Sequence, residues 1–310
     1  MREIVFLEPV FKEMIWGGNR LKTDFLYDIP CDKTGECWAV SAHKNGDCIV
    51  TTGSYVGSTL SHLWQTNRAV FGNISGDVFP LLIKIIDAKD DLSIQVHPDD
   101  EYAKANENGS LGKTECWYIL DCDEDAKIVI GHNANSKQEL TDCIHNNKWD
   151  ELIRVLPIKK GDFFQIDPGT VHAIKAGTLL LETQQNSDVT YRLYDYGRLQ
   201  EGKPRQLHIQ KSIDVIGCPH RDITAQHKIT KLEGAKVDQL ISCEYYTVNL
   251  VELTGKQTFI QDKPFTIISI VEGEGMIDGT RIKKGDHFIL PFEYGEYNMS
   301  GNLRFISSHV

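Results

Sequence analysis

Short runs rich in β-branched and aromatic residues, each ended by turn residues, recur through the middle of the chain. They cover residues 80–86, 92–97, 115–120, 127–130, 162–166, 178–182 and 190–194. Short strands at such close spacing are typical of a β-sandwich or a β-barrel. Helical patterns are fewer: a capping-box pattern begins at Ser136, with Glu139 three residues later, and residues 206–216 carry apolar side chains at helical spacing. The chain is therefore predicted to be mainly β, with a few helices packed alongside.

One seven-residue pattern occurs twice. Residues 158–164 read IKKGDFF and residues 282–288 read IKKGDHF. Two copies are too few for a solenoid, so a strand entered through a Lys-Gly-Asp turn predicts a pair of related β-barrel halves. The first copy runs on through PGTV to His172, whereas the second runs on through LPFEYG with no histidine at the matching place. We therefore expect a catalytic barrel with helical decoration in residues 1–218 and a second, metal-free barrel in residues 219–310.

The composition of the chain argues against some classes of binding partner. With 310 residues, of which 41% are hydrophobic, the chain can bury a sizeable core. The net charge of −11 argues against nucleic acid and against an anionic membrane surface, because both require basic patches. No apolar run reaches membrane-spanning length, and Glu3, Glu8 and Glu13 interrupt the apolar N-terminal stretch, so no signal peptide is expected. Eight cysteines without a C-x-x-C pair predict reduced thiols and a cytoplasmic protein.

Three short polar patterns predict a metal site. In LSIQVHPD the strand period of two puts Gln95 and His97 on one face, and GKTE likewise puts Lys113 and Glu115 together. His172 follows the turn Asp-Pro-Gly. A single histidine is more often a core or surface residue than a ligand. Jointly, however, two neutral imidazoles and a carboxylate suit zinc, iron or manganese, with positions left open for water and substrate.

Five motifs, in this order, resemble the type I mannose-6-phosphate isomerases, and among them the short bacterial form that lacks the large helical insertion. The motifs are WGG at 16–18, LSIQVHPDD at 92–100, GKTECWY at 112–118, PGTVHAI at 168–174 and YRLYDYGR at 191–198. The resemblance covers residues 16–218, and the C-terminal part is similar only in character. Because these isomerases are cupin proteins, it implies two cupin-like (jelly-roll) β-barrels. Gln95 replaces the first histidine of the general cupin His-x-His motif, a departure that this isomerase family shares.

Carried over residue by residue, the resemblance implies a set of site residues. One zinc ion per chain would be bound by His97, Glu115 and His172, with Gln95 as an additional or outer ligand. The catalytic arginine would be Arg192. Residues implied to contact the substrate or line its pocket are Ser93, Lys113, Glu182 and Trp16.

The implied activity is a metal-dependent aldose-ketose isomerisation of mannose 6-phosphate and fructose 6-phosphate through an enediolate. Arg192 would stabilise the developing charge, since a guanidinium is permanently charged and poorly suited to take a proton. The base is open between Glu182 and a metal-bound water. The phosphate is expected to meet Lys113 or the cations of residues 198–205. Simpler structural roles remain open at this stage: Arg192 paired with Asp195, Lys113 exposed in a turn, and Glu182 as a hydrogen-bonded barrel carboxylate.

Two other functions compete. The same ligand set suits non-haem iron, which predicts a cupin dioxygenase that metal analysis and oxygen uptake would reveal. A non-catalytic sugar-binding cupin module is the other alternative, although no required ligand is missing. The expected partner is a small sugar phosphate in each case except the oxygenase, and the oligomeric state is left open.

Overall fold

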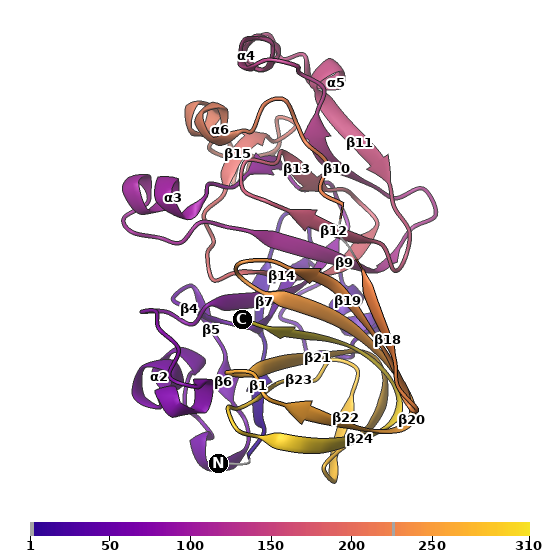
Figure 1. Ribbon diagram of the computed structural model, residues 1–310. Helices are drawn as coiled ribbons and strands as arrows, with labels where there is room; N and C mark the ends of the chain where they lie inside the picture. The colour runs from indigo at the N-terminus through magenta and orange to yellow at the C-terminus, as the bar shows by residue number, and fades with distance from the viewer. Residues whose placement is uncertain (1–2, 225–226) are drawn as a thin grey trace.

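The computed structural model describes residues 3–224 and 227–310 and consists of two β-barrels, drawn one above the other in Figure 1. One sheet of the first barrel has the order β12-β9-β14-β7-β3-β2, with bounds Phe163–Ile166, Glu115–Cys122, Thr178–Gln185, Leu81–Ala88, Thr34–Val40 and Val10–Glu13. Its other sheet has the order β11-β10-β13-β8-β15, with bounds Ile153–Pro157, Lys127–His132, His172–Ile174, Ile94–Val96 and Tyr191–Tyr194. The mainly β fold predicted from the sequence is confirmed.

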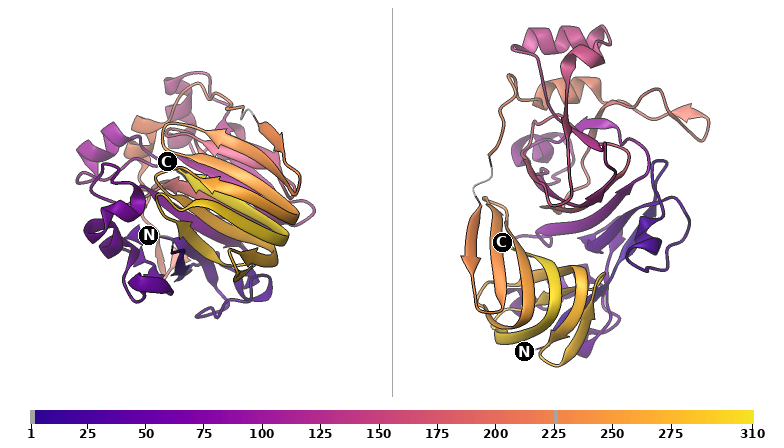
Figure 2. Two further views of the ribbon diagram at one scale, coloured as in Figure 1. Left: turned by 60° about the horizontal axis from the view of Figure 1, so that its bottom comes forward. Right: turned by 90° about the vertical axis from the view of Figure 1, so that its right-hand side faces the viewer.

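The second barrel is a single, strongly curved sheet (Figure 2). Its order is β18-β19-β20-β24-β21-β23-β1-β6, with bounds Lys228–Lys231, Ala235–Ser242, Thr247–Gln261, Gly295–His309, Thr266–Ile277, His287–Leu290, Val5–Glu8 and Ile49–Val50, and β22 (Thr280–Lys283) pairs with β21. Two short ribbons complete the strands, namely β4 (Ala42–His43) with β5 (Gly46–Asp47) and β16 (Leu199–Gln200) with β17 (Lys203–Pro204). Because β1 and β6 pair into this sheet, the N-terminal segment contributes to both barrels.

Helices decorate the β scaffold. They are α1 (Arg20–Thr23), α2 (Leu60–Thr66), α3 (Asp100–Asn106), α4 (Lys137–His145), α5 (Trp149–Leu152) and α6 (Ile209–Val215), with 3-10 turns η1 (Gly53–Tyr55) and η2 (Arg68–Phe71). Helices α4 and α5 lie at the end of the first barrel that is far from the second (Figures 1 and 2). Among the described residues, none of these helices has the length and hydropathy of a membrane span.

The strands and helices expected from the sequence are present with small differences at their ends. Ser136 caps α4 by accepting a hydrogen bond from the backbone N–H of Glu139 at 3.2 Å. The Glu139 carboxylate accepts instead from the N–H of Asn135, so the reciprocal bond of the capping box falls one residue early. Helix α6 is shorter than the predicted 206–216, because it starts only at Ile209.

The repeated pattern forms the same turn twice. In each copy the aspartate side chain accepts from the first lysine's N–H, Lys159 to Asp162 at 2.9 Å and Lys283 to Asp286 at 2.8 Å. The glycines between them have φ of +90° and +93°. Each glycine N–H then bonds to a neighbouring strand, at Ile119 in the first barrel and Ile270 in the second. The two copies therefore enter equivalent strands of the two barrels, as the sequence predicts.

The core explains how the barrels are joined. The outward face of β7, β9 and β14, including Ile83, Tyr118 and Leu181, packs in one continuous apolar cluster with residues of the second barrel such as Tyr246 and Ile306. A separate cluster fills the first barrel around Trp117, and another lies beneath α4 and α6. Since side chains alternate along a strand, the inner face of the same sheet is left to carry polar residues towards one end of the first barrel.

Candidate metal centre

Three strands bring the predicted ligands together at one end of the first barrel. His97 directly follows β8, Glu115 opens β9 and His172 opens β13. In the sheet register His172 lies opposite Gln95, so both side chains share a face, while Ile94 and Val96 pack on the other side. The convergence predicted from the strand period is therefore confirmed, and the three ligands form a group whose candidate metal-binding atoms lie within 4.8 Å of one another.

The distances match those of ligands that share an ion. The Nε2 atoms of His97 and His172 are 3.1 Å apart, and each lies 3.4 Å from a carboxylate oxygen of Glu115. Two atoms that are each about 2.1 Å from one ion lie about 3.0 to 3.4 Å apart when the angle at the ion is about 90° to 110°. All three side chains are 0 or 1% exposed. The arrangement fits a first-row divalent cation.

Hydrogen bonds fix the histidine tautomers. His97 Nδ1 lies 2.8 Å from the Val189 carbonyl and His172 Nδ1 lies 2.9 Å from the Thr170 carbonyl, so both Nδ1 atoms donate. Each Nε2 then presents a lone pair towards the shared point. Burial lowers the pKa of His172 to about 4 and lowers the pKa of His97 well below its ordinary value. Both imidazoles are thus neutral, which is the form that binds metal.

The groups around the point are the Glu115 carboxylate, the Gln95 amide and the Lys113 ammonium, whose Nζ also lies 3.2 Å from His97 Nε2. Burial and the nearby Glu182 together raise the pKa of Glu115 to about 7, although Lys113 and Lys84 act in the opposite direction. Within the described residues Glu115 Oε1 has no hydrogen-bond donor, while Oε2 lies 2.5 Å from the Lys113 ammonium. The amide of Gln95 lies 3.3 and 3.5 Å from the two Nε2 atoms, and a half turn of that amide would present its oxygen as a further ligand. Lys113 is only 4% exposed, so it is not an exposed turn lysine.

A row of polar side chains continues from the ligands across the inner face of the sheet. Glu182 lies opposite both Trp117 and Lys84 in the register, and the Trp117 indole donates to Glu182 at 3.0 Å. The Lys84 ammonium lies 3.5 Å from Glu182 and 3.7 Å from Glu36. Burial opposes ionisation of Glu182, but Lys113 and Lys84 outweigh it and hold the pKa of this carboxyl below its ordinary value.

Lys84 and Glu36 were not identified from the sequence. The one available sign was a lone lysine within the apolar strand LLIKIIDA. At 6% exposure Lys84 is buried, yet Glu36, Glu182 and Glu115 overcome the effect of burial and raise the pKa of its ammonium. It is a permanent buried cation beside the ligands.

Arg192 and Trp16 line a pocket of about 780 Å³ at the edge of the first barrel, together with Lys33, Arg205 and Gln206. Arg192 lies opposite Gln95 in the register of β15 and β8, which puts the arginine on the ligand-bearing face. Its Nη1 donates to the Gln206 carbonyl at 2.9 Å.

Asp195, the partner that the sequence left open for Arg192, pairs with other arginines. Asp195 accepts from Arg198 and from Arg205, and among the described residues no ion pair joins it to Arg192. Ser93 is buried, 4% exposed, two residues before Gln95 on the same strand approach. Of the predicted substrate residues, Lys113 and Glu182 lie beside the candidate ligands, Ser93 lies on the approach to Gln95, and Trp16 lines the pocket that Arg192 also lines.

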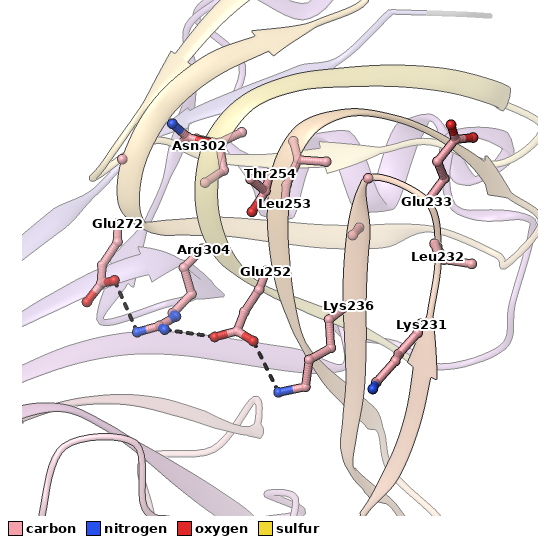
Figure 3. A pocket seen from close by; sticks show the side chains of 14 residues that line it. Lys231, Leu232, Glu233, Lys236, Glu252, Leu253, Thr254, Glu272, Asn302 and Arg304 are labelled. Carbon is pink, nitrogen blue, oxygen red and sulfur yellow. Dashed lines mark hydrogen bonds and ion pairs between the residues drawn. The ribbon is translucent and has the colours of Figure 1, made fainter.

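A larger hollow of about 860 Å³ lies on the second barrel (Figure 3). Four of its charged side chains pair with one another: Glu252 lies between Lys236 at 3.1 Å and Arg304 at 2.8 Å, and Arg304 also reaches Glu272 at 3.1 Å. Among the described residues, the only group of histidine, cysteine and acidic side chains close enough to hold a metal is that of the first barrel. The candidate metal site therefore lies in the first barrel.

The chain is similar to known proteins over its full length. Residues 4–141 match the family "Phosphomannose isomerase type I, catalytic domain", and residues 236–310 match "Mannose-6-phosphate isomerase, cupin domain". The chain is 53% identical to the mannose-6-phosphate isomerase ManA of Bacillus subtilis (strain 168), over 99% of each chain. It is 45% identical to the mannose-6-phosphate isomerase of Streptococcus mutans, over 100% of this chain and 99% of that protein.

The fold agrees as well. A crystal structure of the mannose 6-phosphate isomerase from Bacillus subtilis superposes with a TM-score of 0.98 at 47% identity, covering 99% of both chains. The cupin-like character predicted for the C-terminal barrel is confirmed by the match of its own residues. From the ligand group, the two barrels and these full-length similarities, the chain belongs to the type I phosphomannose isomerase family.

Proposed function

We propose that this chain interconverts mannose 6-phosphate and fructose 6-phosphate, using one zinc ion held by His97, Glu115 and His172. The observation that carries the proposal is the buried ligand group in a chain that is 53% identical over its full length to a mannose-6-phosphate isomerase. Zinc is proposed because two neutral imidazoles and a carboxylate, with room left for further ligands, are a typical catalytic donor set for this metal. A half turn of its amide would let Gln95 serve as a further or outer ligand.

Isomerisation requires moving a proton between two adjacent carbons through an enediolate. The cation, when bound, would polarise the substrate oxygens and so stabilise the negative charge. Arg192 would add a permanent positive charge from the pocket side, where among the described residues no ion pair joins it to Asp195. Trp16, buried in the same pocket wall, would exclude water on that side.

Glu182 is our candidate for the base. Its Oε2 accepts from the Trp117 indole at 3.0 Å, and its Oε1 lies 3.5 Å from the Lys84 ammonium. A carboxylate that is oriented through one oxygen and kept ionised by a neighbouring cation can accept a proton from carbon. The adjacent Lys84 keeps this carboxylate ionised and ready to accept.

The phosphate is proposed to lie at the mouth of the pocket. Three cations, Arg192, Arg205 and Lys33, line the pocket together with two carboxylates, Glu13 and Glu201. Beside it, Arg198 and Arg205 share the single carboxylate of Asp195. This local excess of positive charge suits a dianionic group on an otherwise acidic protein. Lys113 is less suited, because its ammonium already contacts Glu115 at 2.5 Å; we place it, with Ser93, near the sugar end of the substrate.

A coupled assay tests the proposal. Purified protein is given mannose 6-phosphate, and formation of fructose 6-phosphate is followed before chelation, after chelation and after zinc is returned. We expect activity that is lost with the metal and restored with zinc. Absence of turnover in the zinc-loaded protein, or full activity in the metal-free protein, would contradict the proposal. Neither the dioxygenase nor a non-catalytic module is favoured, because the relatives are isomerases and no residue of the proposed machinery is missing.

A further inference from the structure

Four consecutive polar residues at the end of β14 are buried beside the ligands, although none is itself a ligand. Gln184, Gln185, Asn186 and Ser187 are between 0 and 6% exposed. Burying polar side chains is costly unless they are hydrogen-bonded. The hydrogen bonds of this segment therefore indicate which parts of the site the buried side chains hold in place.

Gln185 connects the two chain segments that carry His97 and Glu115. Its Oε1 accepts from the backbone N–H of Thr114 at 2.8 Å, immediately before Glu115. Its Nε2 donates to Asp100 Oδ1 at 3.1 Å, three residues after His97. One side chain thus spans the gap between a ligand that follows β8 and a ligand that opens β9.

The two segments are also in direct backbone contact at this point. Asp100 Oδ1 accepts from the N–H of Gly112 at 2.6 Å, and the N–H of Lys113 donates to the Pro98 carbonyl at 3.0 Å. A Cβ atom on Gly112 would lie 2.5 Å from the backbone nitrogen of Asp100, so only glycine permits this approach. Asp100 is the common acceptor for the backbone of one segment and for Gln185.

The same buried segment orients the His97 ring. The Ser187 hydroxyl donates to the Leu111 carbonyl at 2.9 Å, and the N–H of Val189 lies 3.4 Å from that hydroxyl oxygen. The Val189 carbonyl then accepts from His97 Nδ1 at 2.8 Å. The segment therefore reaches His97 in two ways. Gln185 bonds to Asp100, three residues further along the backbone, and Ser187 contacts Val189, whose carbonyl accepts from the His97 ring.

We propose that Gln185 is a positioning residue, which, through Asp100 and Thr114, sets the separation of His97 and Glu115 and thereby the affinity for the metal. This inference rests on the proposed metal site and extends it to residues that do not touch the ion. Outer partners of metal ligands commonly change metal affinity by about 10- to 100-fold when they are removed. Since the phosphate, which would contribute much of the binding energy, is proposed to lie at the pocket mouth, the effect should fall on kcat more than on KM.

The test is the metal affinity of Gln185→Met, measured by competition with a coloured zinc chelator. Methionine has a similar length and cannot make either hydrogen bond. We expect zinc affinity to fall by about 10- to 100-fold and kcat to fall with little change in KM. Thr183→Val is the matched control on the same strand, because the Thr183 hydroxyl is buried and, within the described residues, has no hydrogen-bond partner. Its affinity should equal that of the unmodified protein.

Exchanging the hydrogen-bond donor and acceptor between residues 185 and 100 tests whether Gln185 acts through its hydrogen bonds or only by filling space. Gln185→Glu keeps an acceptor for Thr114 but faces the Asp100 carboxylate with a second negative charge, so it should also weaken zinc binding. The double variant Asp100→Asn/Gln185→Glu reverses the donor and acceptor between the two side chains and should recover at least half of the lost binding free energy.

Unchanged affinity in Gln185→Met, or no recovery in the double variant, would overturn the inference. If Gln185→Met does not fold, the comparison of the single Gln185→Glu and the double variant decides in the same way. The affinity measurement does not depend on turnover. Zinc binding that responds as predicted in a protein without isomerase activity would support the positioning role and reject the proposed reaction.

Discussion

At the scale of single residues, the centre separates groups that would hold an ion from a group that would stabilise charge. His97, Glu115 and His172 point their ligand atoms at one another, whereas Arg192 reaches the site from the pocket and bonds the Gln206 carbonyl. The two kinds of residue should therefore fail in different ways when they are removed.

Arg192→Ala should lower kcat by about 10²- to 10³-fold, the typical cost of removing one preorganised group that stabilises transition-state charge. Its zinc content should stay at one per chain, because the arginine is not a ligand. His172→Ala is the matched comparison and should lose both zinc and activity. Elemental analysis beside the coupled assay measures both properties. Retained turnover in Arg192→Ala would remove this residue from the mechanism.

The sequence could predict those site residues whose relation depends on neighbours close along the chain, and not those whose partners are distant in sequence. The shared face of Gln95 and His97 depends only on the period of a strand, so it could be predicted. Lys84 could not, because its partners Glu36 and Glu182 lie on β3 and β14 and meet it only through sheet pairing. Gln185 was missed for the same reason: its partners are 71 and 85 residues away along the chain.

At the scale of elements, the two copies of the repeated turn have the same backbone geometry, but different atoms surround their glycines. A side chain at Gly161 would meet no atom within 4 Å, whereas at Gly285 it would lie 3.1 Å from the Tyr27 ring. Gly161→Ala should therefore cost only the conformational penalty of a positive φ, about 1–2 kcal/mol. Gly285→Ala should cost more. Denaturant unfolding of the two variants measures the difference, and equal costs would show that the Tyr27 contact does not constrain the second turn.

His287, just after the second copy of this turn, ties the N-terminal segment to the second barrel. Tyr27 donates its hydroxyl to the Gly285 carbonyl at 2.8 Å and so accepts from His287 Nε2, also at 2.8 Å. His287 Nδ1 then accepts from the Ser269 hydroxyl at 2.9 Å. The ring is neutral in the folded protein, because burial lowers the pKa of His287 to about 3.

This pKa predicts a loss of stability in acid. An unfolded histidine has a pKa of about 6.5, so between that value and about 3 the unfolded state binds a proton that the folded state does not. Stability from this residue is thus complete above the unfolded pKa and falls as the pH drops, by about 2 kcal/mol between pH 7 and about pH 5. His287→Gln should show a correspondingly smaller decrease in its free energy of unfolding over this range. An identical decrease in both proteins would show that His287 does not contribute.

At the scale of the whole molecule, the two barrels share one core. Apolar residues of β7, β9 and β14 pack with those of β19, β20, β21, β23 and β24, and β1 and β6 extend the second sheet. The division into residues 1–218 and 219–310 remains our proposal for where the chemistry lies. It does not describe two separately stable bodies, because each part would expose an apolar face on its own.

The full chain should accordingly unfold in a single calorimetric transition, and a fragment ending at residue 218 should aggregate when it is expressed. The physical reason is that the fragment leaves side chains such as Tyr118 and Leu181 without their partners from the second barrel. A soluble fragment with native zinc affinity, or two well-separated transitions in the full chain, would contradict the shared core. The repeated Lys-Gly-Asp pattern predicted two barrels, but the face that joins them depends on contacts between distant strands.

The most direct test of the central claim is a zinc-edge anomalous diffraction map of crystals grown from zinc-loaded protein. The account predicts one strong peak per chain, about 2.0–2.2 Å from the Nε2 atoms of His97 and His172 and from a carboxylate oxygen of Glu115. A peak bound by other residues, with these three side chains left uncoordinated, would contradict it.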